Sequence, residues 1–349
     1  MTRLAFVASM LVALAVADRP GTARAEVIDP PPPPVDPERG NFWRDLLTPH
    51  KDEIDLILTR ARQALSQADM ALYSDTDPTG LERTRFYKEV YGMLKYARRL
   101  APDNVDVLRL LGQTADEHGK TREAIEALQA AIDLVGPDKV GADVTGRLGI
   151  IYLRLGKLDD AIRYLHAAEG PVIAGQPITA HVLVHLATAL AARGQMGEAI
   201  DVLANAIPAQ VPYYTNELVV VSFALAVQYD RDEQRGAAFE ILDRMQTILQ
   251  GQLATMVQMQ LGGIRFAPAE DRHYYNGLLY EAAGHYAEAR AEWALYAANG
   301  DAPYRRRALD HIAALDELRR DAPRALARSL GITPPPPPPP PTGHRRRHP

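Results

Sequence analysis

Cysteine is absent from the 349 residues of this chain. Disulfide bonds, thiolate catalysis and zinc sites with cysteine ligands are therefore excluded, and so is a lipoprotein signal, which needs a cysteine after its cleavage site. Serine occurs only five times, and no G-x-S-x-G, H-E-x-x-H or phosphate-binding glycine-rich motif is present. Because these absences remove the common catalytic constellations, the sequence predicts a protein that is not an enzyme and needs no cofactor.

Long apolar runs are missing too, except at the N-terminus. Arg3 is followed by an apolar run over residues 4–17 and then by Ala23-Arg24-Ala25. This order is typical of a secretory signal peptide, residues 1–25, cleaved after Ala25. The run is shorter than the roughly 20 residues that span a bilayer. We therefore predict a periplasmic or secreted protein that contacts membrane only through the signal segment; a retained signal anchor is the alternative.

Positive charge is scarcer than negative charge, and the formal net charge is −5. Residues 1–25 carry three arginines and one aspartate, so the processed chain would carry −7. Without Arg345, Arg346 and Arg347 near the C-terminus, about −10 remains. A body of this sign argues against nucleic acid as the partner.

Proline is concentrated at the two ends of the chain. Five prolines at residues 30–34 lie in segment 26–50, and eight at residues 334–341 begin segment 334–349. Such runs form extended polyproline II structure and cannot build a packed core. The sequence predicts a linker over residues 26–50 and a disordered tail with a basic tip over residues 334–349.

Between these ends, one pair of apolar stripes at helical spacing occurs repeatedly. Each stripe predicts an amphipathic helix of about three turns, and a glycine such as Gly119 marks the turn between the two helices. An offset of 12 residues separates two equivalent positions in each copy: Gly112 and Ala124, Gly149 and Ala161, Ala187 and Ala199, Leu225 and Ala237, Gly277 and Ala289. One helix pair cannot bury both its faces, so successive pairs are expected to stack into an array.

The unit resembles the tetratricopeptide repeat. The family's leucine–glycine pair, later small residue, large apolar residue and closing proline fall on Leu111, Gly112, Ala124, Leu128 and Pro137. The match departs at the start of the unit, where the family has a bulky aromatic residue and this chain does not. The resemblance implies a protein–protein interaction scaffold, whose first helices line a concave groove for a segment of a partner.

The expected fold is an all-α, right-handed superhelical α-solenoid of about five such helix pairs over residues 105–303. A helix pair over residues 51–104 and a helix over residues 304–333 are predicted to cap its ends. About 14 extra residues lie between residues 247 and 271. We expect them to extend the preceding helix through Leu261 and to end in a loop.

Carried onto this sequence, the family's groove runs from charged residues to aromatic ones. The partner-binding residues that it implies are Arg109, Gln113, Arg147, Arg154, His181, His185, Phe223, Tyr229, Tyr274 and Tyr275. The lysines and asparagines of the family's carboxylate-gripping variant are absent from these positions, which argues against capture of a C-terminal carboxylate.

Two other functions stay open at this point. In the first, the proline- and arginine-rich tail binds an anionic envelope polymer and the repeats act as a spacer. In the second, His181 and His185, four residues apart on one helix face, are two ligands of a metal-dependent enzyme, although no third ligand is visible. The adjacent carboxylates Asp116 and Glu117 point in different directions on a helix, and we expect them to be solvated.

Overall fold

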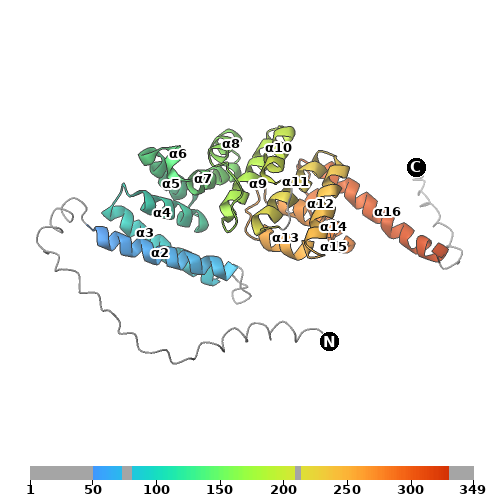
Figure 1. Ribbon diagram of the computed structural model, residues 1–349, viewed down its shortest axis with the longest axis horizontal. Helices are drawn as coiled ribbons and strands as arrows, with labels where there is room; N and C mark the ends of the chain where they lie inside the picture. The colour runs from blue at the N-terminus through green and yellow to red at the C-terminus, as the bar shows by residue number, and fades with distance from the viewer. Residues whose placement is uncertain (1–49, 73–80, 209–213, 330–349) are drawn as a thin grey trace, which may run out of the picture. The chain divides into compact units, whose positions relative to one another are not determined.

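A computed structural model describes residues 50–72, 81–208 and 214–329 of the chain (Figure 1). The predicted signal peptide and the proline-rich tail lie outside the described residues, as does nearly all of the linker. The described residues from 52 onward belong to one compact unit, and every contact below lies within it.

The described residues are almost entirely helical and contain no strand. The helices are α2 (Lys51–Leu72), α3 (Leu81–Leu100), α4 (Val105–Glu117), α5 (Thr121–Val135), α6 (Pro137–Val140), α7 (Ala142–Arg154), α8 (Leu158–Ala167), α9 (Pro177–Ala192), α10 (Met196–Ala206), α11 (Asn216–Arg231), α12 (Arg235–Ile248), α13 (Leu253–Leu261), α14 (Asp271–Ala282), α15 (Tyr286–Ala298) and α16 (Arg305–Ser329). None of the described helices is both long and apolar enough to cross a membrane.

Five helix pairs follow one another in sequence order, which confirms the all-α solenoid (Figure 1). The pairs are α4/α5, α7/α8, α9/α10, α11/α12 and α14/α15, and the helices of each pair pack on each other. The first helices also pack on their neighbours, α4 on α7, α7 on α9 and α9 on α11. Because each pair covers a face of the next, the core is continuous along the array.

The turn inside each pair has the same backbone geometry. The second residue after the first helix is left-handed, and it is glycine in four pairs, as at Gly119 with φ 73°, and Glu233 with φ 60° in the fourth. The next N–H then donates to the carbonyl five positions earlier: Lys120 to Ala115 (2.7 Å), Lys157 to Tyr152 (2.9 Å), Gln195 to Leu190 (2.9 Å), Gln234 to Tyr229 (2.9 Å) and His285 to Tyr280 (2.8 Å). This is the bond that closes a Schellman C-cap, so one turn geometry sets the angle of all five pairs.

The segment between α12 and α14 differs from the prediction. The second helix of the fourth pair does not extend through Leu261, because it ends at Ile248. Gln250 and Gly251 follow with φ of 52° and 82°, a left-handed backbone that cannot continue a right-handed helix. A separate helix, α13, then packs on α11 and α14 through buried residues including Leu253 and Val257. We call residues 249–270, which comprise α13 and the loop after it, the insert.

Candidate partner-binding site

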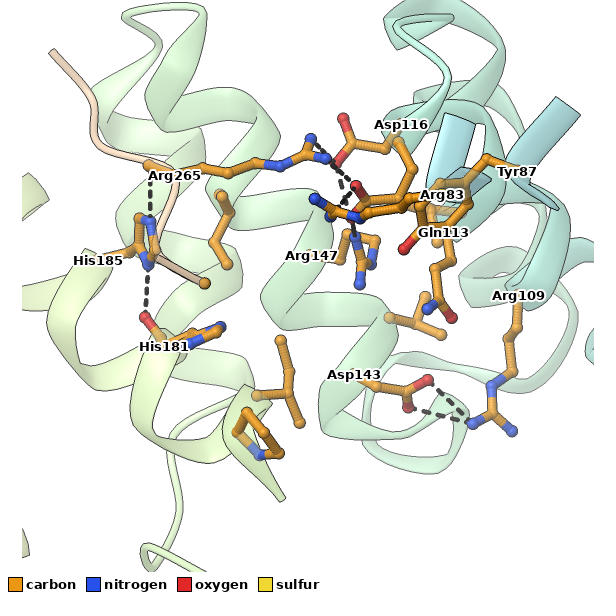
Figure 2. A pocket seen from close by; sticks show the side chains of 17 residues that line it. Arg83, Tyr87, Arg109, Gln113, Asp116, Asp143, Arg147, His181, His185 and Arg265 are labelled. Carbon is orange, nitrogen blue, oxygen red and sulfur yellow. Dashed lines mark hydrogen bonds and ion pairs between the residues drawn. The ribbon is translucent and has the colours of Figure 1, made fainter. Parts of the chain in front are cut away.

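A cavity of about 370 Å³ lies between the first helices of the first three pairs (Figure 2). Its walls come from α3, α4, α7 and α9, and the insert closes one side through Gly263 and Arg265. Apolar side chains, among them Val144, Ile150 and Ile178, form part of the wall, and charged side chains form most of the rest. The cavity therefore has both polar and apolar surface, as binding sites commonly do.

The deep end of the cavity holds two buried carboxylates among arginines. Asp116 and Glu117, at the end of α4, have side chains only 2% and 11% exposed. Arg147 of α7 donates to Glu117 at 3.2 Å, and Arg265 of the insert donates to Asp116 at 3.2 Å and also pairs with Glu117. Arg83 of α3 donates to Glu117 at 3.3 Å. Arg154 of α7 also pairs with Asp116, and we call these two carboxylates and four arginines the deep cluster.

Asp116 and Glu117 were expected to be solvated, and that expectation is wrong. The physical reason is that the two carboxylates lie where α4 meets α7 and the insert, so that guanidinium groups rather than water satisfy them. Part of this arrangement is visible in the sequence, because Arg147 and Arg154 are seven residues apart on one face of the next first helix.

The entrance of the cavity carries a separate and balanced set of charges. Arg109 of α4 donates to Asp143 at 3.0 and 3.2 Å and to Asp106 at 3.3 Å. Arg62 of α2 donates to Asp106 at 3.2 Å. Gln113 lines the cavity between this set and the deep cluster (Figure 2). Two arginines and two aspartates make the entrance neutral.

His181 and His185 lie on the α9 wall in an electropositive setting. Burial, the neighbouring His185 and the charge of Arg147 lower the pKa of His181 to about 3. Burial also lowers the pKa of His185, against the opposing effect of two backbone carbonyls. These are the carbonyls of His181, 2.6 Å from Nδ1, and of Arg265, 3.0 Å from Nε2. Both ring nitrogens of His185 thus face protein oxygens, which is not the geometry of a metal ligand.

No group of three or more potential metal-ligating side chains occurs among the described residues. Both imidazoles line the cavity, and Nε2 of His185 lies 3.0 Å from the carbonyl oxygen of Arg265 in the insert.

The aromatic half of the predicted groove is covered by the chain itself. The side chains of Phe223, Tyr274 and Tyr275 are 0–1% exposed. The ring of Phe266, from the insert, lies 5.0 Å from that of Tyr275 in an edge-to-face contact, and Phe223 packs on the same ring at 6.0 Å. Tyr229 is partly buried against the core.

Five of the ten predicted site residues therefore line one cavity: Arg109, Gln113, Arg147, His181 and His185. Arg154 lies next to it through Asp116. Phe223, Tyr229, Tyr274 and Tyr275 do not line this cavity, and their contact with a partner stays a prediction. Sequence reasoning missed Arg83 and Arg265, because neither lies in the helices that the family uses for its groove.

A second polar cluster attaches α16 to the array. His311 of α16 bridges Asp230 of α11 and Glu281 of α14, with its ring nitrogens 3.0 Å and 2.9 Å from their oxygens. Arg307 also pairs with Asp230, and the ring of Trp293 stacks on His311 at 4.3 Å. Burial alone would lower the pKa of His311, but the two carboxylates outweigh it and raise the pKa. The two carboxylates thus favour the charged form of the imidazole.

Comparison with known proteins places the repeats in a family. The profile of the tetratricopeptide repeat matches residues 92–139, 109–172 and 147–214. A search of curated proteins returned no match. Similar solved structures include the MamA protein, at 16% identity and TM-score 0.41 over 57% of this chain and 93% of that one.

PilF of Pseudomonas aeruginosa is similar at 12% identity and TM-score 0.43, over 73% of this chain and 96% of that one. PilW, described as a type IV pilus biogenesis factor, is similar at 16% identity and TM-score 0.40, over 70% of this chain and 98% of that one. The three overlapping profile matches span α4 to α10, which include the first three helix pairs and most of the cavity wall. Residues 92–214 of the chain therefore carry tetratricopeptide repeats.

Proposed function

We propose that this protein is a non-enzymatic scaffold that binds a segment of another protein in the cavity between α3, α4, α7 and α9. Repeats of this family generally bind other proteins and generally lack catalytic activity. The observation that carries the proposal is the convergence of Arg109, Gln113 and Arg147 on one cavity beside the apolar side chains of Ile150 and Ile178. Polar groups fix the orientation of a bound segment, and apolar walls supply affinity.

The partner would contact the first three helix pairs, which line the cavity, and would leave the fourth and fifth pairs untouched. At the fourth and fifth pairs, Phe266 and α13 already cover the surface of the first helices that a partner would otherwise contact. Displacing them would expose side chains that now form the core, at a cost of roughly 25 cal/mol for each Å² of apolar surface. A segment bound only to the first three helix pairs leaves these contacts intact.

Capture of the partner tests the proposal. The chain from residue 26 onward serves as bait in extracts of its own cell envelope, with crosslinking. Gln113→Trp places an indole ring in the cavity and narrows it, and the side chain of Gln113 has no hydrogen bond in the described structure that this change would break. We expect this variant to lose the captured protein, whereas Arg122→Trp, at an exposed site on α5, retains it.

A bait that lacks residues 334–349 separates the cavity from the tail. Equal capture by this bait and by the longer one supports the cavity as the contact. If the bait without residues 334–349 captures nothing while Gln113→Trp captures the partner fully, the cavity is not the contact and the repeats act as a spacer.

We further propose that the protein is exported and that its partner is an envelope or secreted protein. Support comes from the basic start, the short apolar run and the Ala23-Arg24-Ala25 site of residues 1–25. Cell fractionation with N-terminal sequencing tests this: an exported protein beginning at Glu26 is the expected result. A cytoplasmic protein that retains residues 1–25 would contradict it.

A further inference from the structure

We propose that the cavity binds an acidic segment through side-chain carboxylates, which contact Arg147 and Arg265 at its deep end. This inference rests on the proposed function, because it names the chemistry of the segment that the same cavity takes. It is carried by the charge balance of the deep cluster and by which of its groups face the open space.

The deep cluster has an excess of positive charge. Arg83, Arg147, Arg154 and Arg265 surround Asp116 and Glu117, a net charge of +2. Each guanidinium carries five N–H donors, whereas two carboxylates offer only about eight lone-pair positions. Donors therefore remain after every acceptor in the cluster has been used, on a chain whose overall formal charge is −5.

Exposure decides which sign an entering ligand meets. The side chains of Arg147 and Arg265 are 22% and 33% exposed, whereas those of Asp116 and Glu117 are 2% and 11% exposed. The guanidinium groups of Arg147 and Arg265 are thus more accessible than the two carboxylates that they contact. A cation entering here would meet arginines first and be repelled, and an anion would meet N–H donors.

The other charged groups at the cavity do not reverse this sign. Arg62 and Arg109 balance Asp106 and Asp143 at the entrance. The two histidines on the α9 wall are neutral near pH 7, because their pKa values are lowered. They add no positive charge that would hold a second anion near α9. The charge that selects the ligand is therefore at the junction of α4, α7 and the insert.

The geometry also makes the site depend on the insert. Arg265 belongs to the insert, outside the repeats, and it reaches residues 148 and 149 positions earlier in the chain. The site consequently needs the insert in place. Apolar walls beside the arginines, including Ile150 and Ile178, suit a segment in which acidic and apolar side chains alternate.

Fluorescence anisotropy with labelled short peptides tests the inference on the chain from residue 26 onward. The acidic peptide alternates glutamate with leucine, and its C-terminus is amidated so that only side-chain carboxylates are offered. Matched peptides carry glutamine or lysine in place of glutamate. We expect binding of the acidic peptide alone, weakening as salt is added.

Two variants shift the cluster charge in opposite directions. Arg147→Gln lowers it to +1 and is expected to weaken binding at least about tenfold, because a charge-assisted bond is lost. Glu117→Gln raises it to +3 and is expected to tighten binding. Arg290→Gln, which breaks an exposed pair with Asp316 on α15 and α16, is the control and leaves binding unchanged. Circular dichroism confirms that each variant is folded.

Several results would overturn the inference. If the lysine peptide binds more tightly, or the glutamine peptide binds equally well, the site does not select negative charge. If neither Arg147→Gln nor Glu117→Gln changes the affinity for the acidic peptide, the peptide does not bind at the deep cluster. Binding of inorganic phosphate without binding of the acidic peptide assigns the cavity to a small anion and refutes a peptide ligand.

The same variants separate this inference from the function on which it rests. If Gln113→Trp abolishes partner capture while the acidic peptide does not bind, the scaffold function stands and the anionic chemistry is wrong. If the acidic peptide binds while neither Gln113→Trp nor Arg147→Gln alters capture, the cavity binds anions but is not the partner site.

Discussion

Replacing a helical glycine has opposite consequences for stability at different places in this chain. A Cβ added at Gly277 of α14 would lie 2.6 Å from the indole ring of Trp293. That ring cannot move aside, because it is fully buried, stacks on His311 and meets Tyr274 edge-on at 4.8 Å. At Gly92, on an exposed face of α3, an added Cβ would meet nothing within 4 Å.

Alanine at these two glycines should therefore change stability in opposite directions. Gly277→Ala overpacks a rigid contact, and we expect a loss of about 1–3 kcal/mol in the free energy of unfolding. Gly92→Ala should gain up to about 1 kcal/mol, because alanine favours the helix more than glycine does. Urea unfolding followed by circular dichroism measures both, and a stabilised Gly277→Ala protein would contradict the close approach of α14 and α15.

His311 is the residue at which pH should act on the array. Its raised folded pKa means that the native state holds the proton more tightly than the unfolded chain does. The stabilisation is complete below the unfolded value of about 6.5 and is lost as pH rises through the folded pKa. Asp230 and Glu281 then lose the cation between them, although Arg307 still pairs with Asp230.

His311→Gln should consequently be most damaging in mild acid. We expect a loss of roughly 3 kcal/mol near pH 6, since a buried pair loses its charged partner, and a smaller loss near pH 9. Thermal melts at several pH values give this difference. His166→Gln, at an exposed pair with Glu169, serves as the control, and a loss that grows with pH would refute the charged form of His311.

At the scale of an element, the insert joins parts of the array that are far apart in sequence. It packs on α11 through α13, contacts Tyr275 through Phe266, and reaches the first helix pair through Arg265. Removal of the Arg265 side chain breaks the contact with the first pair but leaves the α13 packing intact.

We therefore expect Arg265→Ala to loosen the loop after α13 without unfolding the repeats. Hydrogen exchange measured by mass spectrometry should show residues 262–268 exchanging about tenfold faster, the consequence of roughly 1.5 kcal/mol lost in charge-assisted bonds. The repeats at residues 105–206 should exchange as before. Met259→Ala, at a half-exposed site on α13, is the matched control, and identical exchange in both variants would show that Arg265 does not hold the loop.

The sequence was sufficient for the helix pairs but not for the insert. The offset of 12 residues predicts each pair, because a fixed turn and small residues such as Gly149 against Leu165 leave little freedom inside the unit. The break at Gln250 and Gly251 carries no strong signal, since glutamine rarely adopts a positive φ. The pairing of Arg265 with Asp116 depends on tertiary contacts, and no local periodicity encodes it.

The candidate site, too, could be predicted from the sequence only where it depends on the repeat and not on tertiary contacts. Arg109, Gln113 and Arg147 follow from the register of the first helices, so the family resemblance was enough to bring them together. The burial of Tyr274 and Tyr275 depends on what covers them, and their position in the repeat contains no such information.

For the whole molecule, stability in a repeat array is a sum of neighbouring interfaces, so removing an end should have local effects. Residues 304–321 cover the last pair: Tyr304 lies over the guanidinium of Arg231 at 4.5 Å, and Arg307 and His311 satisfy Asp230. Without them, a buried carboxylate and the face of α15 that holds Trp293 would meet water.

A chain ending at residue 303 should thus lose at least about 3 kcal/mol and expose apolar surface near α14 and α15. Urea unfolding and binding of a hydrophobic dye measure the two effects. A chain ending at residue 329 keeps every contact described here and should match the full chain. If both truncated chains behave alike, α16 does not cap the array.

The large sequence separation between Arg265 and its partners also affects the order in which contacts form during folding. The turns and helix pairs form from contacts between neighbours, and such local contacts close quickly. The bonds from Arg265 to Asp116 and Glu117 close loops of 149 and 148 residues, which adds entropy cost to their formation. Refolding should therefore be biphasic: the helix signal returns first, and the bonds from Arg265 to Asp116 and Glu117 form afterwards. During that interval Arg265 does not yet close its side of the cavity, so a partner present at synthesis meets a different surface from one that arrives later.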